Sequence, residues 1–266
     1  SNVAAVTDTV TATQWTTLVN AVNTVRKHQS GVGFTNVGTY TAGTVINATN
    51  DVGGNLTSAF TNRLTYTAQG STLTGSTNSP NFTLVNSTSA ATFSFSRTAT
   101  FANADAVRYF FNAGGQLNFV VSSVTNGDGT NRSGSLATLA ATNFASKKIG
   151  AQDAVARTGS GCTVNADLTT NYGYYVQTTA NLTMANITGT SAAYTSDFLK
   201  FYAKTNGVQG TNSDNGTIMT LSMDLYSAAQ SPAINDSINI TVNHRVDVIY
   251  PSTTFLANTW GSVTIG

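Results

Sequence analysis

Residues suited to acid–base or nucleophilic chemistry are scarce in this chain, which has two histidines, His28 and His244, and one cysteine, Cys162. A Ser-His-Asp triad would have to recruit one of these histidines, and no Gly-x-Ser-x-Gly motif accompanies either of them. A single cysteine forms neither an intrachain disulfide nor a thiolate cluster, and nothing pairs Cys162 with a histidine. We expect His28 to be a cation at a helix end and His244 to be a core histidine on the apolar face of a strand.

Carboxylates are the second source of acid–base chemistry, and all eleven acidic residues here are aspartate. Glycoside hydrolysis needs two carboxyl groups, one of them with a raised pKa. Asp224 and Asp247 fall on the polar faces of predicted strands and are the pair that the sequence offers for cleaving a polysaccharide. Their spacing alone does not bring them together, so this activity is the least favoured of the hypotheses.

Two loops, residues 126–131 and 212–216, carry oxygen ligands of the kind that Ca²⁺ prefers. Each loop has one carboxylate, Asp128 or Asp214, which gives little affinity for a hard cation. Both are expected to be exposed turns. The sequence therefore predicts no metal and no cofactor, and we expect that the protein is not an enzyme.

The composition is unusual in its lack of charge. Charged residues make up 9% of the 266 residues, the net charge is +1, and 40% of the residues are hydrophobic. Such neutrality argues against a nucleic-acid partner or an anionic membrane surface, and no apolar run approaches the roughly 18 residues of a membrane span. The two adjacent basic pairs, Arg26-Lys27 and Lys147-Lys148, are interpreted as solvated ends of elements. Threonine is abundant, and it favours strands while its hydroxyl group faces water without charge.

One helix is predicted over residues 11–29. Thr11 and Gln14 have the spacing of a capping box, and Gly31 and Gly33 end the segment. Its apolar residues recur at helical spacing and form a narrow stripe that suits one contact surface. Those expected to dock on a neighbouring chain are Trp15, Leu18, Val22 and Val25.

Beyond this helix the pattern is that of strands. Apolar and polar residues alternate over 91–101, 217–226 and 237–250, which predicts one buried and one wet face for each. Arg97 interrupts the apolar face of the first strand and is expected near its edge. The predicted fold class is mainly β, an antiparallel β-sandwich of jelly-roll-like type with an N-terminal α-helix.

The domain division follows the change of pattern. We predict a helical docking segment over 1–34 and a β-sandwich domain over 35–266, with any subdivision near 126–165. Residues 126–135 and 205–216 are predicted loops, and a short helix is expected within 135–152.

Residues 104–124 read ADAVRYFFNAGGQLNFVVSSV and are predicted to form a hairpin. Its strands would be 106–111 and 116–124, joined through 112–115, where Gly114 and Gly115 permit a tight reversal. Arg108 is expected at a strand edge or paired with a nearby aspartate.

The hairpin segment resembles one in virion proteins of tailed bacteriophages, in which an Arg-Tyr-Phe-Phe-Asn run meets a double glycine. Residues 12–31, ATQWTTLVNAVNTVRKHQSG, are similar to the opening of such proteins, and residues 253–263, TTFLANTWGSV, to their C-termini. The resemblance implies a structural virion component of the tail, neck or a fibre. It supplies no catalytic residue.

The leading hypothesis is therefore a non-enzymatic structural subunit of a phage particle, located in the virion. It would assemble with copies of itself and with other virion proteins, because open, hydroxyl-rich strand edges invite pairing. One alternative is a capsid decoration protein. Another is a domain that binds a host-surface glycan, with Tyr172, Tyr174 and Tyr175 as the candidate stacking residues.

Overall fold

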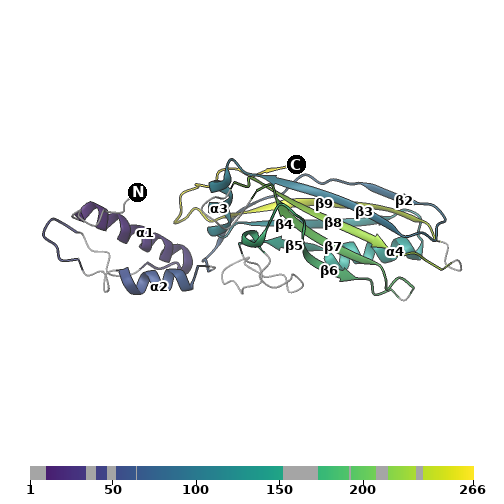
Figure 1. Ribbon diagram of the computed structural model, residues 1–266, viewed down its shortest axis with the longest axis horizontal. Helices are drawn as coiled ribbons and strands as arrows, with labels where there is room; N and C mark the ends of the chain where they lie inside the picture. The colour runs from purple at the N-terminus through teal and green to yellow at the C-terminus, as the bar shows by residue number, and fades with distance from the viewer. Residues whose placement is uncertain are drawn as a thin grey trace.

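The computed structural model describes residues 10–33, 40–46, 52–63, 65–151, 173–191, 193–207, 215–231 and 236–266. Figure 1 shows an elongated molecule with two helices, α1 (Ala12–Ser30) and α2 (Gly54–Thr61), at one end. The strands, together with the remaining helices, occupy the rest of its length. We call the described residues between 10 and 63 the helical arm. Because α2 packs on α1, the helical part reaches beyond residue 34.

The first sheet has β9 (Ile238–Pro251) at its centre, paired antiparallel with three strands. Its other members are β1 (Gln69–Leu73), β2 (Asn81–Leu84), β4 (Gln116–Asn126) and β5 (Ser146–Ile149). The strand predicted over 237–250 is confirmed as β9.

The second sheet is also antiparallel, with the order β10-β3-β8-β7-β6. Its members are β3 (Ala91–Thr100), β6 (Leu182–Thr188), β7 (Phe198–Thr205), β8 (Ile218–Ser227) and β10 (Thr264–Ile265). The strands predicted over 91–101 and 217–226 are confirmed as β3 and β8. Arg97 on β3 is partly buried and donates a hydrogen bond to the Ser76 carbonyl at 2.9 Å.

The inner faces of the two sheets share one hydrophobic core. His244 of β9 lies fully buried in it, with its ring centroid 4.6 Å from that of Phe95 and 5.7 Å from that of Phe119. Burial lowers the pKa of His244, so its ring is neutral at neutral pH. The predicted core histidine is confirmed, and so is the fold class: mainly β, two antiparallel sheets in a sandwich-like arrangement, and an N-terminal helix.

The predicted strand at 106–111 is wrong, because these residues belong to the helix α3 (Ala104–Asn112). The Asn103 side chain caps the helix by accepting a hydrogen bond from the Ala106 amide at 2.8 Å. The buried residues Ala106, Val107, Phe110 and Phe111 have helical rather than alternating spacing. The second predicted strand, 116–124, is confirmed as β4, and Arg108 pairs with Asp105 as expected.

The middle of the chain is more helical than predicted. The helix α4 (Asn131–Thr138) begins inside the expected loop 126–135, with Thr130 as its N-cap. The π-helical turn η2 (Leu139–Phe144) follows, which confirms a short helix within 135–152. A further short 3₁₀ helix, η3, spans Tyr174–Val176. Most of the predicted loop 205–216 lies outside the described residues.

Lys147 is not the solvated residue that the sequence predicted. Its side chain is buried, and its ammonium group donates to the carbonyls of Phe144 at 2.6 Å and Ser146 at 3.2 Å. The ammonium also lies 4.8 Å from the centre of the Phe144 ring. Carbonyl oxygens and an aromatic face thus replace its water.

At the end of the sandwich far from the helical arm, Arg132 of α4 is fully buried. Its guanidinium donates to the Ser227 hydroxyl at 2.9 Å and to the backbone carbonyls of Ser87, Ser89, Ala228 and Asp236. Ser227 is the last residue of β8, and the four carbonyls belong to the loops between β2 and β3 and between β8 and β9. One side chain therefore ties α4 to two loops that each connect the two sheets.

We predict that Arg132→Met lowers the free energy of unfolding by about 3–5 kcal/mol, because it removes a fully buried guanidinium and leaves its four part-buried carbonyl partners without this donor. Urea denaturation monitored by circular dichroism measures the change. The control is Arg108→Met, which removes a surface ion pair and is expected to cost less than about 1 kcal/mol. Equal effects of the two substitutions would contradict the role given to Arg132.

Candidate functional site: the helical arm and its junction

The predicted helix over 11–29 is confirmed as α1. The backbone amide of Gln14 donates to the Thr11 hydroxyl at 3.2 Å. The backbone amide of Thr11 donates to the side-chain oxygen of Gln14 at 2.9 Å, which completes the capping box. At the other end Gly31 has a φ of 76° and donates to the Lys27 carbonyl at 2.8 Å. The left-handed conformation explains why glycine ends the helix.

The helical arm has a small core of its own. Trp15, Val19 and Val52 form a buried cluster apart from the core of the sandwich. Tyr40 packs against it, its ring edge-on to that of Trp15 at 6.2 Å. Val22 is also buried, and four buried apolar side chains are few for holding together two helices.

The structure divides the four predicted interface residues into two pairs. Trp15 and Val22 are 8% and 6% exposed, so the chain itself covers them. Leu18 and Val25 are 41% and 40% exposed and remain accessible. The docking role stays a prediction, and within this set it falls to Leu18 and Val25.

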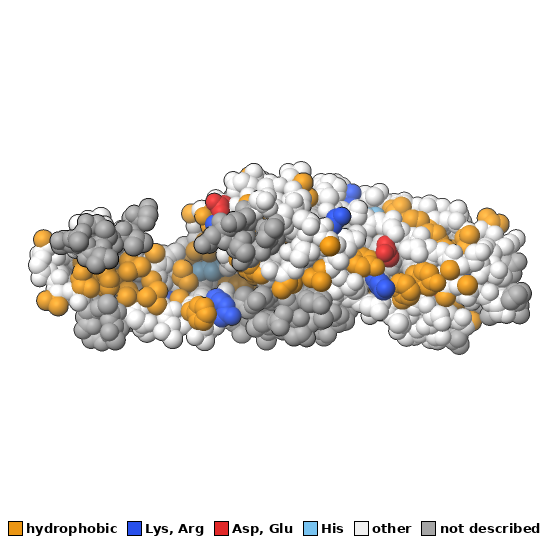
Figure 2. Space-filling view, viewed as in Figure 1, with side chains coloured by type: hydrophobic (Ala, Val, Ile, Leu, Met, Phe, Trp, Pro, Cys, Tyr) orange, Lys and Arg blue, Asp and Glu red, His pale blue; other side chains and the backbone are white. Residues whose placement is uncertain are grey.

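Exposed apolar side chains are concentrated on the helical arm. Of the twelve large hydrophobic residues exposed in the described part of the chain, eight precede residue 61. These eight are Val10, Leu18, Val25, Val32, Val45, Ile46, Leu56 and Phe60. Figure 2 shows apolar side chains gathered over the arm, whereas on the sandwich they form a row within a mostly uncharged polar surface. Clusters of this kind mark interaction surfaces.

The arm meets the sandwich at His28, which is 6% exposed. Its Nε2 atom donates to the Ala113 carbonyl at 3.0 Å, and its own carbonyl accepts from the Thr67 amide at 3.0 Å. Burial lowers the pKa of His28 despite the bond to Ala113. The expectation of a helix-end cation is wrong, because the neutral ring is buried between the arm and α3.

Tyr66 completes this junction. Its ring stacks on that of His28, with centroids 6.0 Å apart and planes at 21°. Gly114 also lies against this ring: its φ of 97° favours glycine, and the Cβ of any other residue would approach the Tyr66 ring to 2.6 Å. The double glycine therefore allows both the turn from α3 to β4 and the close approach of Tyr66.

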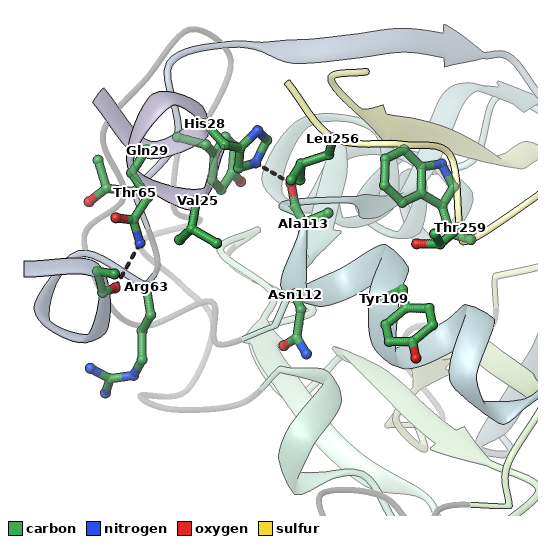
Figure 3. Close-up of a pocket in the computed structure, with 13 residues that line it drawn as sticks. Val25, His28, Gln29, Arg63, Thr65, Tyr109, Asn112, Ala113, Leu256 and Thr259 are labelled. Carbon is green, nitrogen blue, oxygen red and sulfur yellow. Dashed lines mark hydrogen bonds between the residues drawn. The ribbon is translucent and has the colours of Figure 1, made fainter. Parts of the chain in front are cut away.

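A cavity of about 360 Å³ opens beside the junction. Figure 3 shows Val25 and Gln29 on the arm side, Tyr109 and Asn112 on α3, and Leu256 on the C-terminal segment. The Gln29 side chain donates to the Ala59 carbonyl at 2.7 Å and so joins α1 to α2. Of the described residues that line the cavity, only Arg63 carries a charge, so the cavity suits an apolar side chain better than an ion.

The aspartates weighed for catalysis are not brought together. Asp224 lies on the outer face of one sheet, where it accepts from the Ser94 hydroxyl at 2.6 Å. Asp247 lies on the outer face of the other sheet and accepts from Arg245 at 2.9 Å and from the Gly75 amide at 3.1 Å. Two packed sheets, about 10 Å apart, lie between these faces. The pair therefore does not have the geometry of a glycosidase.

Within the described residues, the other candidate sites do not form a catalytic or metal-binding group. Asp128 accepts from the amide and hydroxyl of Thr130, as in an ordinary turn before a helix. The second loop, with Asp214, and the residues Cys162 and Tyr172 lie outside the described part of the chain. Where the structure does describe the chain, no group of three or more His, Cys, Asp or Glu side chains is placed to hold a metal ion.

The tyrosines proposed for glycan stacking are largely committed to the fold. Tyr174 is fully buried, and its ring stacks on that of Phe111 at 4.6 Å. Tyr175 is partly buried and donates a short hydrogen bond to the Asn112 side chain. Tyr174 therefore has no face for a sugar.

Among the described helices, none combines the length and the hydrophobicity of a membrane span.

In comparisons with known proteins, no family model matches this chain, and no curated protein or solved structure shows significant similarity to it.

Sequence reasoning missed the residues of the junction. Tyr66 lies in a segment with no clear periodicity, and its contact with Gly114 joins residues far apart in the sequence. The detectable signal is the double glycine after an aromatic run, which by itself indicates a hairpin turn rather than a contact surface.

We predict that Gly114→Ala destabilises the protein more than Gly129→Ala does. Both glycines have positive φ, 97° and 69°, so both substitutions carry the cost of about 1–2 kcal/mol for a left-handed conformation. Only at Gly114 does the new methyl group meet the Tyr66 ring, since nothing lies within 4 Å at Gly129. Thermal unfolding compares the two variants, and equal losses would contradict the close contact at the junction.

A second prediction concerns pH. Because the pKa of His28 is lower in the folded than in the unfolded state, the unfolded chain binds more protons below about pH 6.5. The contribution of His28 to stability is therefore present at neutral pH and is lost as the pH falls. In His28→Gln, whose amide can still donate to Ala113, the unfolding free energy should depend less on pH between 5 and 7.5.

Urea unfolding of both proteins at several pH values measures this difference. His244 and Asp197 also have shifted pKa values, but they are common to both proteins, so the difference in slope isolates His28. Identical slopes would contradict a buried neutral His28.

Proposed function

We propose that the protein is a non-enzymatic structural subunit of a bacteriophage particle, located in the virion. In this proposal it assembles as a homo-oligomer in a tail, neck or fibre-like appendage, and it contacts other virion proteins. The observation that carries the proposal is the concentration of exposed apolar side chains on the helical arm, at one end of a sandwich. This is the arrangement expected of a subunit that docks by one end.

The character of the sandwich supports the same proposal. Its outer strand faces carry hydroxyl and amide groups, such as those of Ser94, Asn243 and Ser123, which bond to neighbouring strands. Such a surface stays in contact with water without the charge that keeps most soluble monomers apart. A subunit held in place by neighbours does not depend on charge repulsion.

The segment that resembles phage virion proteins contributes its aromatic residues to the molecule's interior. Phe110 and Phe111 of α3 are buried, and the Phe111 ring contacts Tyr174. The resemblance is thus to residues that build the region joining arm and sandwich. This resemblance supports the proposed function from the sequence alone.

The alternatives are less well supported. A capsid decoration protein would use the same docking end and differs in the site of attachment. Glycan binding loses Tyr174, which is buried, and the two carboxylates weighed for a depolymerase, Asp224 and Asp247, lie on the outer faces of different sheets.

Incorporation into particles tests the proposal. We expect the full chain, expressed in infected cells with a short C-terminal tag, to co-purify with virions through a density gradient. A chain lacking residues 1–63 should be lost from the particle fraction by at least tenfold, because it lacks the docking end. The control is Val85→Asp, an exposed change on the sandwich, which should incorporate normally.

Circular dichroism of the truncated chain checks that the sandwich still folds. Incorporation of the folded truncated chain at the level of the full chain would contradict the docking role, and absence of the full chain from virions would contradict the proposed function itself.

A further inference from the structure

One face of α1 has the residue spacing of helices that pair. Gln14, Leu18, Ala21 and Val25 follow one another at intervals of four, three and four residues, which places them in one row along the helix. Leu18, Ala21 and Val25 are exposed and Gln14 is partly buried. This row lies beside the buried stripe of Trp15, Val19 and Val22, so it is a second apolar face of the same helix.

On α2, Leu56 and Phe60 are one helical turn apart and are 46% and 70% exposed. The described part of the arm therefore has two helices, four buried apolar side chains, and exposed apolar residues on both helices. Two such pairs of helices that pack together would form a four-helix arrangement, a common way to bury such faces.

The lack of charge along this row of α1 favours an uncharged partner surface, such as the same row of a second copy. Residues 12–25 contain no Asp, Glu, Lys or Arg, so the row offers nothing for a charged partner to recognise. For the same reason it does not repel a second copy of itself. The charges of this helix, Arg26 and Lys27, lie together in its last turns.

The positions of Arg26 and Lys27 also favour one relative orientation of two paired α1 helices. In a parallel pair, the basic ends of both copies would meet. In an antiparallel pair centred between Leu18 and Ala21, they would lie about 20 Å apart along the helices, beyond the screening length of about 8 Å in physiological salt. Leu18 would then pack on the small Ala21 of the second copy, and Val25 would pack beside Gln14 of that copy.

We infer that the helical arms of two copies of this chain pack together antiparallel through the row Gln14, Leu18, Ala21 and Val25, related by a two-fold axis. The inference rests on the proposed function, in which the arm docks on a neighbour, and it names that neighbour as a second copy. Two-fold pairing of identical surfaces is the commonest symmetry of soluble oligomers.

Light scattering coupled to gel filtration of the full chain tests the pairing over a range of concentrations. We expect a mass of twice the 27.6 kDa of one copy. Leu18→Asp should raise the dissociation constant at least tenfold, because it places a carboxylate against its counterpart's apolar row. Val85→Asp, at a side chain 75% exposed on the sandwich, should leave it unchanged.

Circular dichroism confirms that Leu18→Asp is folded, and Val25→Asp provides a second variant at an exposed site. A monomer at all concentrations, an oligomer other than a pair, or a pair that survives both substitutions would overturn the inference.

Disulfide trapping tests the direction. Variants Gln14→Cys and Val25→Cys, each with the native Cys162 replaced by Ser, are mixed and oxidised. In Gln14→Cys the side-chain acceptor of the capping box is lost, but the backbone amide at position 14 still donates to the Thr11 hydroxyl, so this half of the cap persists. Intact-mass measurement should find mainly the mixed disulfide, and a predominance of like-with-like disulfides would contradict antiparallel pairing.

Failure of the inference can be told apart from failure of the proposed function. A chain that is monomeric in solution but enters particles only with its arm would dock on another virion protein, and only the inference would fall. A chain that pairs through its arm but is absent from virions would retain the inference and lose the proposed function.

Discussion

The position of the helical arm depends on one buried contact, the hydrogen bond from His28 to the Ala113 carbonyl with Tyr66 stacked beside it. Ala113 is the residue at which α3 ends, and Gly114 then turns the chain into β4. The last turn of α1 is therefore attached to the point where the sandwich begins. A side chain larger than hydrogen at Gly114 would displace Tyr66, and a charge on His28 would have to be accommodated without water. The same close packing therefore requires both a glycine at position 114 and an uncharged ring at His28.

A second constraint is the scarcity of charge, which is met differently inside and outside the molecule. Outside, hydroxyl and amide groups satisfy one another across strands. Inside, the two cations buried in the described part of the chain are surrounded by hydrogen-bond acceptors: Arg132 by four carbonyls and a hydroxyl, and Lys147 by two carbonyls. A buried cation is tolerated only when its donors are satisfied, so these residues hold loops and turns in place. The apolar residues of the arm, by contrast, remain uncovered.

The sequence predicted those parts of the fold that local periodicity determines. The capping box of α1 and the alternation in β3, β8 and β9 gave the helix, the strands and the buried position of His244. The helix α3 was missed because Val107, Tyr109, Phe110 and Phe111 favour strands, whereas the Asn103 cap and contacts with Phe101 and Tyr174 stabilise the helix. Lys147 was misjudged because its partners depend on the π-helical turn before it. The junction and the cavity join distant segments, and no local pattern contains that information.

The central claim is that the protein is a structural subunit that docks by its helical arm. A cryo-electron microscopy map of the intact particle tests it most directly, since it locates each copy of the chain and its neighbours. The account predicts density for the sandwich with Leu18, Val25, Leu56 and Phe60 buried against a neighbouring chain. A map in which the arm faces solvent while the sandwich makes the contacts would contradict it.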